Sequence, residues 1–305
     1  MSRPSRGDAG GRAYLDLQNL ARRQGRSTQS LLVLYVLERF LARLSTHRDR
    51  DRFVLKGGML LAAWDARRAT MDGDLLASGV SIDAEQILRA VADIAATPPQ
   101  VEDGVQFLTD TAVATSIRDG DLYGGIRVTM RALLSTAEVK VQLDVSTGDP
   151  VTPGPQPITY PALRAVHQPV PLLGYPLPVV LAEKLCTAVD LGAANTRVRD
   201  YFDIATLTGR HDVAADDLLA ALTATAAHRG VRLRPLTEVI GDLPATRSVT
   251  YTAFLRRLGP DAADAPARFQ DVVDLVTAFA DPALEGSLGD DARWNASYRT
   301  WHGPA

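Results

Sequence analysis

Two aspartates separated by one residue, Asp72 and Asp74, form the first pattern in the chain that could support chemistry. Residues two apart on a β-strand project from the same face, so both carboxylates can ligate divalent cations. Magnesium prefers oxygen ligands and usually shares them with substrate phosphates. Because acidic pairs are also common in loops, the neighbouring segments have to decide between a metal site and an ordinary turn.

A glycine pair, Gly57-Gly58, precedes the acidic pair and follows Lys56 and a strand-like run over residues 52–55. An apolar segment typical of a helix, residues 59–64, comes next. At a strand-to-helix junction, glycines let backbone N–H groups approach a phosphate, and the start of the helix adds favourable partial charge. The alternative interpretation is a tight turn that binds no ligand.

A third carboxylate, Asp144, lies in a run over residues 138–145 in which polar and apolar side chains alternate strictly. Such a strand buries its apolar face and turns its polar face to solvent or to a cleft. Asp144 could therefore ligate a metal or accept the proton of an incoming hydroxyl. The alternative is a solvated sheet face without a ligand.

The second half of the chain contributes charged residues at helical spacing. Lys184 lies off the centre of an apolar stripe, where its ammonium could offset phosphate charge. Asp200 and Asp203 share one helix face, and Arg197 and Arg199 lie beside them. Any one of these charges is typical of a solvated helix, so the group carries more weight than its members.

Hydrophobic periodicity predicts the elements that must position these residues. Helices are expected around the apolar stripe from Leu15 to Ala21, after an N-cap at Ser27, and over residues 83–96. Antiparallel strands are expected over residues 104–117, 123–133 and 138–147. From residue 179 to about residue 280 the pattern is helical, with the next helix after Lys184 starting near residues 195–196, and the remainder is irregular.

The length of 305 residues predicts two lobes rather than one small domain. We expect N-terminal helices and a sheet-containing lobe over residues 1–150, and a helical lobe over residues 179–305. The proline- and glycine-rich segment 151–178 is interpreted as the crossing between them. The predicted fold class is therefore α+β with two lobes.

Composition narrows the class of protein. Hydrophobic residues make up 46% of the chain and charged residues 23%, which is typical of a soluble globular protein. The one cysteine excludes an internal disulfide or a cysteine zinc cluster. The start of the chain lacks the apolar core of a signal peptide, and no apolar run could span a bilayer. These features predict a cytoplasmic protein with no membrane segment.

The formal net charge of −3 argues against a general nucleic-acid coat protein, but basic residues gather locally. Two groups could bind RNA phosphates: Arg118, Arg127 and Arg131 on the middle strands, and His228, Arg229, Arg232 and Arg234 in the second lobe. The alternative is scattered solubilising charge. RNA binding through such groups should weaken steeply with salt.

The chemically relevant residues occur in a definite order: Lys56-Gly57-Gly58, Arg68-x-Thr70-x-Asp72-x-Asp74, Asp144, Glu183-Lys184-Leu185 and Arg199-Asp200-x-x-Asp203. This set resembles the AbiEii/AbiGii family of nucleotidyltransferase toxins, and is especially similar to its mycobacterial MenT branch. The resemblance covers roughly residues 53–207. It implies a polymerase-β-like nucleotidyltransferase lobe with a mixed sheet, followed by a helical lobe.

The resemblance also implies roles for the site residues. Asp72, Asp74 and Asp144 would hold Mg²⁺ or Mn²⁺, and Lys56, Gly57, Gly58, Arg68 and Thr70 would bind the triphosphate of an NTP. Lys184 would match the NTP-binding lysine. Asp203 is taken as the catalytic aspartate of the second lobe and Asp200 as nucleotide-binding, although the spacing leaves their assignment open. In MenT toxins the hydroxyl at the Thr70 position can be phosphorylated, which silences the enzyme.

The function implied is that of a toxin in a toxin–antitoxin system. Such an enzyme transfers NMP from an NTP to the 3′ end of tRNA, which blocks aminoacylation and translation, and it has a cognate antitoxin protein. The chain departs from the wider pattern at Gly58, where serine is usual, and at Gly73, where an apolar residue is common. Backbone donors would have to replace the serine hydroxyl, and Gly73 would loosen the strand.

Three other interpretations remain open. A haloacid-dehalogenase-type phosphohydrolase also begins with Asp-x-Asp, but here Arg67-Arg68 precedes the pair where a long apolar strand is usual, and Leu75-Leu76 follows it. A non-catalytic nucleotide-binding module could share the fold, because fold does not dictate function. A nucleotidyltransferase could instead modify protein hydroxyls or a small molecule.

Overall fold

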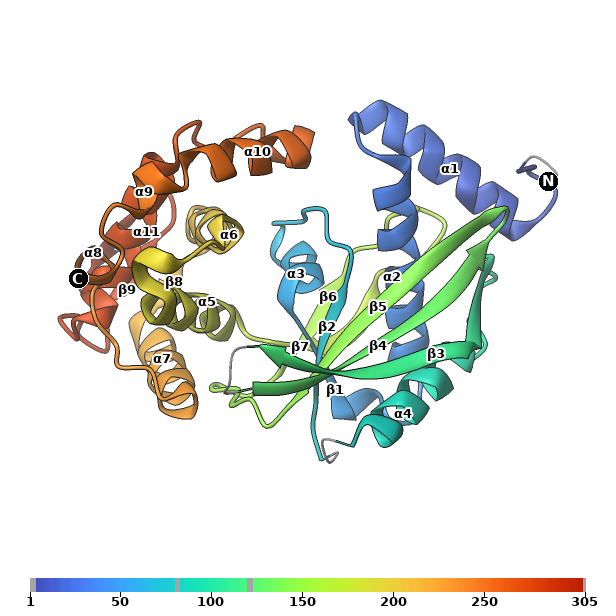
Figure 1. Ribbon diagram of the computed structural model, residues 1–305, viewed down its shortest axis with the longest axis horizontal. Coiled ribbons are helices and arrows are strands. Elements are labelled where there is room, and N and C mark those ends of the chain that lie inside the picture. Colours follow the sequence, from blue (N-terminus) through green and yellow to red (C-terminus); the bar gives the residue numbers. More distant parts are fainter. Residues whose placement is uncertain (1–3, 80–82, 120–122, 304–305) are drawn as a thin grey trace. The chain divides into compact units, whose positions relative to one another are not determined.

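A seven-stranded mixed sheet organises the first part of the chain in this computed structural model, which describes residues 4–79, 83–119 and 123–303 (Figure 1). The strand order is β3-β4-β5-β2-β1-β7-β6. The strands are β1 (Phe53–Lys56), β2 (Gly73–Ala77), β3 (Val105–Asp119), β4 (Tyr123–Leu134), β5 (Ala137–Thr147), β6 (Gln156–Tyr160) and β7 (Val170–Gly174). The three longest strands fall where alternation predicted them.

Strand β2 lies in the middle of the sheet. It pairs in parallel with β5 on one side and antiparallel with β1 on the other. The hairpin strands β3, β4 and β5 continue the sheet antiparallel, whereas β7 pairs in parallel with β1 and antiparallel with β6. Side chains of β2 therefore have neighbours from β1 and β5, which carry Lys56 and Asp144.

Three helices support this sheet: α1 (Ala9–Gln24), α2 (Thr28–Thr46) and α4 (Ala84–Ala96). Helix α2 packs on β4, β5 and β7, and α4 packs on β3 and β4. The predicted N-cap of α2 is present, because the Ser27 hydroxyl accepts a hydrogen bond from the Ser30 N–H at 3.4 Å. The apolar face of β5 is buried, as alternation predicted.

The segment expected to cross between lobes contains two strands of this sheet instead. Strand β6 is at the edge of the sheet, where Pro157 costs no internal ladder bond. Pro171 in β7 precedes Leu173 and Gly174, the two residues that pair with β1, so its missing N–H falls outside that pairing. High proline content therefore suggested a linker where the chain forms short strands.

The chain divides into two units, each described here by itself. The first unit comprises Met1–Gly148 and Gln156–Gly174, and the second comprises Asp149–Pro155 and Tyr175–Ala305. The first lobe was expected to end at residue 150, whereas residues 156–174 belong to the first unit and residues 149–155 to the second.

The second unit is mainly helical, as predicted. Its helices are α5 (Leu177–Leu191), α6 (Val198–Thr208), α7 (Ala215–Arg229), α8 (Leu236–Val239), α9 (Leu243–Thr246), α10 (Ser248–Leu258) and α11 (Phe269–Leu284). Helix α6 begins two or three residues later than the expected position near residues 195–196. Within the described ranges, no helix combines the length and apolar content that crossing a membrane requires.

The C-terminal remainder, expected to be irregular, forms a small antiparallel sheet with β8 (Val213–Ala214), β9 (Arg293–Asn295) and β10 (Thr300–His302). Two indole N–H groups fix it: Trp294 donates to the Thr208 carbonyl at 2.7 Å and Trp301 to the Phe279 carbonyl at 2.8 Å. Strands of two or three residues are too short for an alternation signal.

Candidate functional site

Four charged residues form one row across neighbouring strands of the sheet. In the strand register, Lys56 of β1 pairs with Asp74 of β2, Asp74 pairs with Asp144 of β5, and Asp144 pairs with Arg127 of β4. The structure thus places Asp144 directly beside Asp74, although 70 positions along the chain separate them. A cation flanks each end of this carboxylate pair.

The Asp74 carboxyl has a raised pKa because of its position in this row. Burial and then the charge of Asp72 raise its pKa to about 6, and the charge of Asp144 adds to the effect. The Lys56 ammonium and a hydrogen bond from the Gly58 N–H, at 3.3 Å, act in the opposite direction. Three acidic groups therefore repel one another here, and a divalent cation would relieve that repulsion.

Asp72 lies just before β2 rather than on it, so the acidic pair is not formed by two residues of one strand. The Thr70 hydroxyl donates to its Oδ1 at 2.6 Å. Gly73 is the first residue of β2. A Cβ at this position would lie 2.9 Å from the Leu143 side chain. A side chain at position 73 would therefore require the Leu143 side chain on β5 to move.

The glycine pair makes room for acidic and hydroxyl side chains. Gly57 has φ +63°, and a Cβ on it would lie 1.9 Å from Asp74 Oδ2. A Cβ on Gly58 would lie 2.9 Å from Thr70 Oγ1 and 3.5 Å from the Arg68 guanidinium. The sequence pattern did identify a constrained turn, and the structure shows which side chains constrain it.

The helix after the glycine pair is shorter than expected. Helix α3 (Gly57–Leu60) has only four residues and continues as a 3₁₀ turn over Leu61–Trp64. A single turn provides little of the partial charge that was expected to attract a phosphate. The Gly58 N–H, expected to face a phosphate, donates to Asp74 instead.

The three carboxylates expected to bind a metal differ in how well they could do so. Among the described residues, no three Asp, Glu, His or Cys side chains converge as a metal site. Asp144 is held by Arg127 through two hydrogen bonds, Nε to Oδ1 at 2.8 Å and Nη2 to Oδ2 at 2.7 Å. Asp72 and Asp74 fit a magnesium ion that takes one or two carboxylates and completes its shell with phosphates and water.

In the second unit, Lys184 joins the two aspartates of α6. Its Nζ donates to Asp200 Oδ1 and to Asp203 Oδ2, both at 2.8 Å. Burial alone would raise the pKa of Asp200, but Lys184, and then Arg197 at 2.7 Å, outweigh it and lower the pKa to about 2. Asp203 is 1% exposed. These contacts fix the ammonium in a buried ionic cluster.

A comparison with known protein families shows which family the chain belongs to. A family model described as the nucleotidyl transferase AbiEii toxin of type IV toxin–antitoxin systems matches residues 39–275. The chain belongs to this family. It is therefore a nucleotidyltransferase of the toxin class, which removes the phosphohydrolase and non-catalytic interpretations. No curated protein matches the sequence.

Solved structures were also compared with this chain. The toxin MenT4 of Mycobacterium tuberculosis is 19% identical with a TM-score of 0.56, and the match covers 90% of this chain and 91% of that one. JHP933 of Helicobacter pylori has 17% identity and a TM-score of 0.41, covering 90% and 89%. A putative nucleotidyltransferase of H. pylori has 17% identity and a TM-score of 0.39, covering 90% and 92%. The likeness to MenT4 confirms the predicted fold class.

Most of the arginines proposed to bind RNA form ion pairs with acidic side chains of the same chain. Arg127 holds Asp144, and Arg131 lies 3.4 Å from Glu138; the side chain of Arg118 is outside the described residues. In the second unit, Arg229 donates to the Glu183 and Thr187 side chains.

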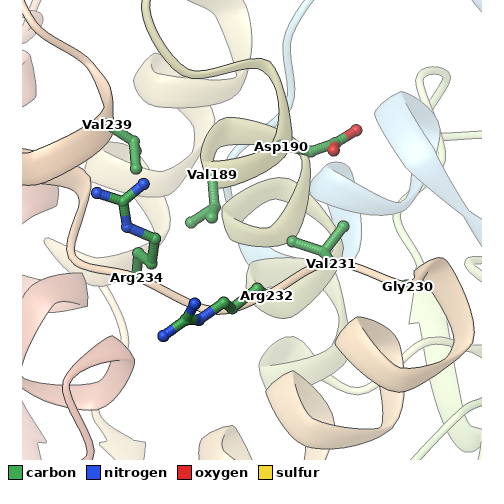
Figure 2. A pocket seen from close by; sticks show the side chains of 7 residues that line it. All are labelled: Val189, Asp190, Gly230, Val231, Arg232, Arg234 and Val239. Atoms are coloured by element: carbon green, nitrogen blue, oxygen red, sulfur yellow. The ribbon is translucent and has the colours of Figure 1, made fainter.

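The loop after α7 keeps two of these arginines at the surface. In the sequence, Arg232 and Arg234 alternate with Val231 and Leu233. The two arginines line a cavity of about 530 Å³, together with Val189 and Val239 (Figure 2). Arg234 is paired with Glu238 at 3.1 Å, and Asp190 also lines the cavity. The Glu238 carboxylate therefore offsets the charge of Arg234.

Sequence reasoning missed that Arg127 is the partner of Asp144. The signal was available in the two-residue break at Ser135-Thr136, because a hairpin closed there pairs Leu134 with Ala137. Counting outwards from that pair brings Arg127 opposite Asp144. Arg127 was instead assigned to RNA.

Proposed function

We propose that this AbiEii-family toxin transfers NMP from an NTP to the 3′ end of tRNA in a reaction that requires Mg²⁺ or Mn²⁺. Loss of a free tRNA 3′ end would block aminoacylation and translation. Family membership supports nucleotidyl transfer, whereas the acceptor, the metal and the roles below are our proposal. The observation that carries it is the position of Asp74 at the Gly57-Gly58 turn, opposite Asp144 in the strand register and close enough to Asp72 for their charges to interact.

Asp72 and Asp74 are the proposed metal ligands. A divalent cation bound there would offset triphosphate charge and polarise the α-phosphate. Arg68 and Lys56 would add positive charge, since Arg68 lies against Gly58 and Lys56 pairs with Asp74 in the register. Phosphoryl transfer of this kind depends mostly on positioning and electrostatic stabilisation.

The proposed chemical step is an in-line displacement. A ribose hydroxyl oxygen of the acceptor forms a bond to the α-phosphorus, the bond from that phosphorus to the bridging oxygen breaks, and pyrophosphate leaves. Asp144 accepts the hydroxyl proton. Arg127 binds both carboxylate oxygens of Asp144, and each oxygen retains a second lone pair for this task.

Lys184 is proposed to bind phosphate, with Asp200 and Asp203 holding its ammonium until substrate is bound. Both aspartates accept a hydrogen bond from the Lys184 ammonium at 2.8 Å, so both are assigned the same supporting role. A lysine held between two carboxylates keeps its positive charge, which is the form that phosphate binding needs.

The test uses the purified full chain with each of the four labelled NTPs and, in separate reactions, total tRNA, total protein and small-molecule extract. Label on the tRNA 3′ end is expected, and Asp72→Ala should reduce it to background. Asp110→Ala is the matched control, because Asp110 is exposed on β3 and outside the site. Label on protein or a small molecule, with none on tRNA, would reject the proposed acceptor.

The same pair of variants can be compared in cells. Expression of the intact chain is expected to stop growth, as is expression of Asp110→Ala, whereas Asp72→Ala should be tolerated. The family implies a cognate antitoxin, and its co-expression should restore growth.

A further inference from the structure

Thr70 makes two contacts that together set the geometry of the acidic site. Its hydroxyl donates to Asp72 Oδ1 at 2.6 Å, a short charge-assisted hydrogen bond. Its side chain is 7% exposed and also fills the space above Gly58, where a Cβ would come within 2.9 Å of the hydroxyl oxygen. One residue thus connects the glycine turn to the first aspartate.

Asp72 needs such a connection because no strand holds it. Strand β2 begins at Gly73, and residues 66–70 before the acidic pair have no regular secondary structure. Asp74, in contrast, is fixed by strand pairing on both sides and by the Gly58 N–H. The two carboxylates of the pair are therefore positioned by different means, one by the sheet and one by Thr70.

We propose that Thr70 is a positioning residue that orients the Asp72 carboxylate for the divalent cation, and that residue 58 must be glycine because Thr70 occupies its side-chain space. This inference rests on the proposed function and assigns Thr70 to the aspartate rather than to the triphosphate. Partners that orient metal ligands typically change metal affinity or activity by about 10–100-fold when they are removed.

The first experiment measures the Mg²⁺ concentration that gives half-maximal nucleotidyl transfer by the full chain. Thr70→Val removes the hydroxyl while keeping a branched side chain, and it should raise this concentration by about 10–100-fold. Thr70→Ser retains the hydroxyl and should restore most of the loss. The matched control is Thr97→Val, whose hydroxyl bonds only a backbone carbonyl of α4. The inference would be overturned if the half-maximal Mg²⁺ concentration of Thr70→Val lay within about threefold of the value for the parent chain.

A double-mutant cycle tests the steric part. Gly58→Ala should push the Thr70 hydroxyl away from Asp72 and raise the Mg²⁺ requirement in the parent chain. In a Thr70→Ala background the same change should have little further effect, because the 2.9 Å contact is gone. Equal effects of Gly58→Ala in both backgrounds would reject the coupling.

Mn²⁺ binding to the same variants, measured by electron paramagnetic resonance with no acceptor present, separates this inference from the proposed function. If the parent chain modifies protein instead of tRNA, the tRNA proposal fails, yet weaker Mn²⁺ binding by Thr70→Val would still support the role of Thr70. If Thr70→Val and the parent bind Mn²⁺ equally, the inference fails even when tRNA is the acceptor.

Discussion

Asp74 and Asp144 lie opposite each other in the parallel register of β2 and β5. Neighbouring strands of a sheet are only about 5 Å apart, so like charges placed opposite one another destabilise the sheet. The flanking cations Lys56 and Arg127 offset part of this repulsion, but burial and Asp72 still raise the pKa of Asp74 to about 6. A cation bound to these carboxylates, as proposed, would relieve the repulsion that remains.

Replacing Asp74 by asparagine should make the metal-free protein more stable. The folded pKa of about 6 lies above the ordinary value of 3.8, so the ionised carboxyl costs stability that grows as pH rises from 3.8 to 6. At pH 7 without divalent metal, Asp74→Asn should raise the melting temperature by a few degrees while abolishing transfer. Thermal unfolding in chelator checks this, with Asp110→Asn as the exposed control. A lower melting temperature for Asp74→Asn would contradict it.

A second prediction concerns the ionic cluster of α5 and α6. Lys184→Met leaves Asp200 and Asp203 buried without their shared ammonium, and should destabilise the fold by about 3–5 kcal/mol. Adding Asp200→Asn and Asp203→Asn to that variant removes the buried carboxylate charges that the ammonium had balanced. It should recover most of the stability, apart from the ion pair between Asp200 and Arg197. Denaturant unfolding measures both effects.

Activity of the same triple variant separates structure from catalysis. If Lys184 binds phosphate, the refolded triple variant should remain inactive in the NTP transfer assay although its fold is restored. Recovery of transfer together with stability would show that Lys184 serves only the fold.

Much of the first unit could be predicted because its signals are local. Strand β5 alternates buried and more exposed residues along most of its length, and Ser27 and Asp83 cap their helices with side chains that sequence statistics favour. The acidic residues were identified by type and order, and the parallel pairing that brings Asp144 to Asp74 followed only from the fold. No local rule sets the register between strands so distant in the sequence.

The errors have physical causes of their own. Proline content suggested a linker over residues 151–178, yet Pro157 lies on the edge strand β6, and Pro171 lies outside the two residues of β7 that pair with β1. The RNA-binding groups were predicted from the clustering of basic residues in the sequence. The ion pair between Arg229 and Glu183 forms only in the folded chain, where helices α7 and α5 pack together. Charge pairing between elements depends on tertiary contacts, which composition does not report.

Arg229 and Arg232 should therefore behave differently on substitution. Arg229 donates to the Glu183 carbonyl, the Glu183 carboxylate and the Thr187 hydroxyl, joining α7 to α5. Arg229→Ala should cost about 1–3 kcal/mol of unfolding free energy. Arg232 is exposed, so Arg232→Ala should change stability by less than about 0.5 kcal/mol.

A further prediction asks whether Arg232 contacts RNA. If the loop after α7 contacts RNA phosphate, Arg232→Ala should weaken tRNA binding at low salt and lower the slope of log affinity against log salt by about one. Filter binding over a range of salt concentrations measures this slope. An unchanged slope would assign Arg232 to solvated surface charge.

The last prediction concerns the pH dependence of the first unit. His167 is 6% exposed, and its Nε2 lies 2.9 Å from the Tyr35 hydroxyl and 3.4 Å from Arg164. Burial, followed by the charges of Arg39 and Arg164, lowers its pKa to about 4, with Asp103 opposing. The folded protein thus holds an uncharged imidazole where the unfolded chain would bind a proton below pH 6.5.

Stability from this histidine is complete above pH 6.5 and is lost as pH falls towards 4, by at most about 3 kcal/mol. Nuclear magnetic resonance should show the His167 ring unprotonated at pH 5. Denaturant unfolding of His167→Gln should then lose less stability between pH 6.5 and 4.5 than the parent chain, whereas the exposed control His302→Gln should follow the parent. A ring that titrates near its ordinary pKa of 6.5 would contradict the buried, uncharged state.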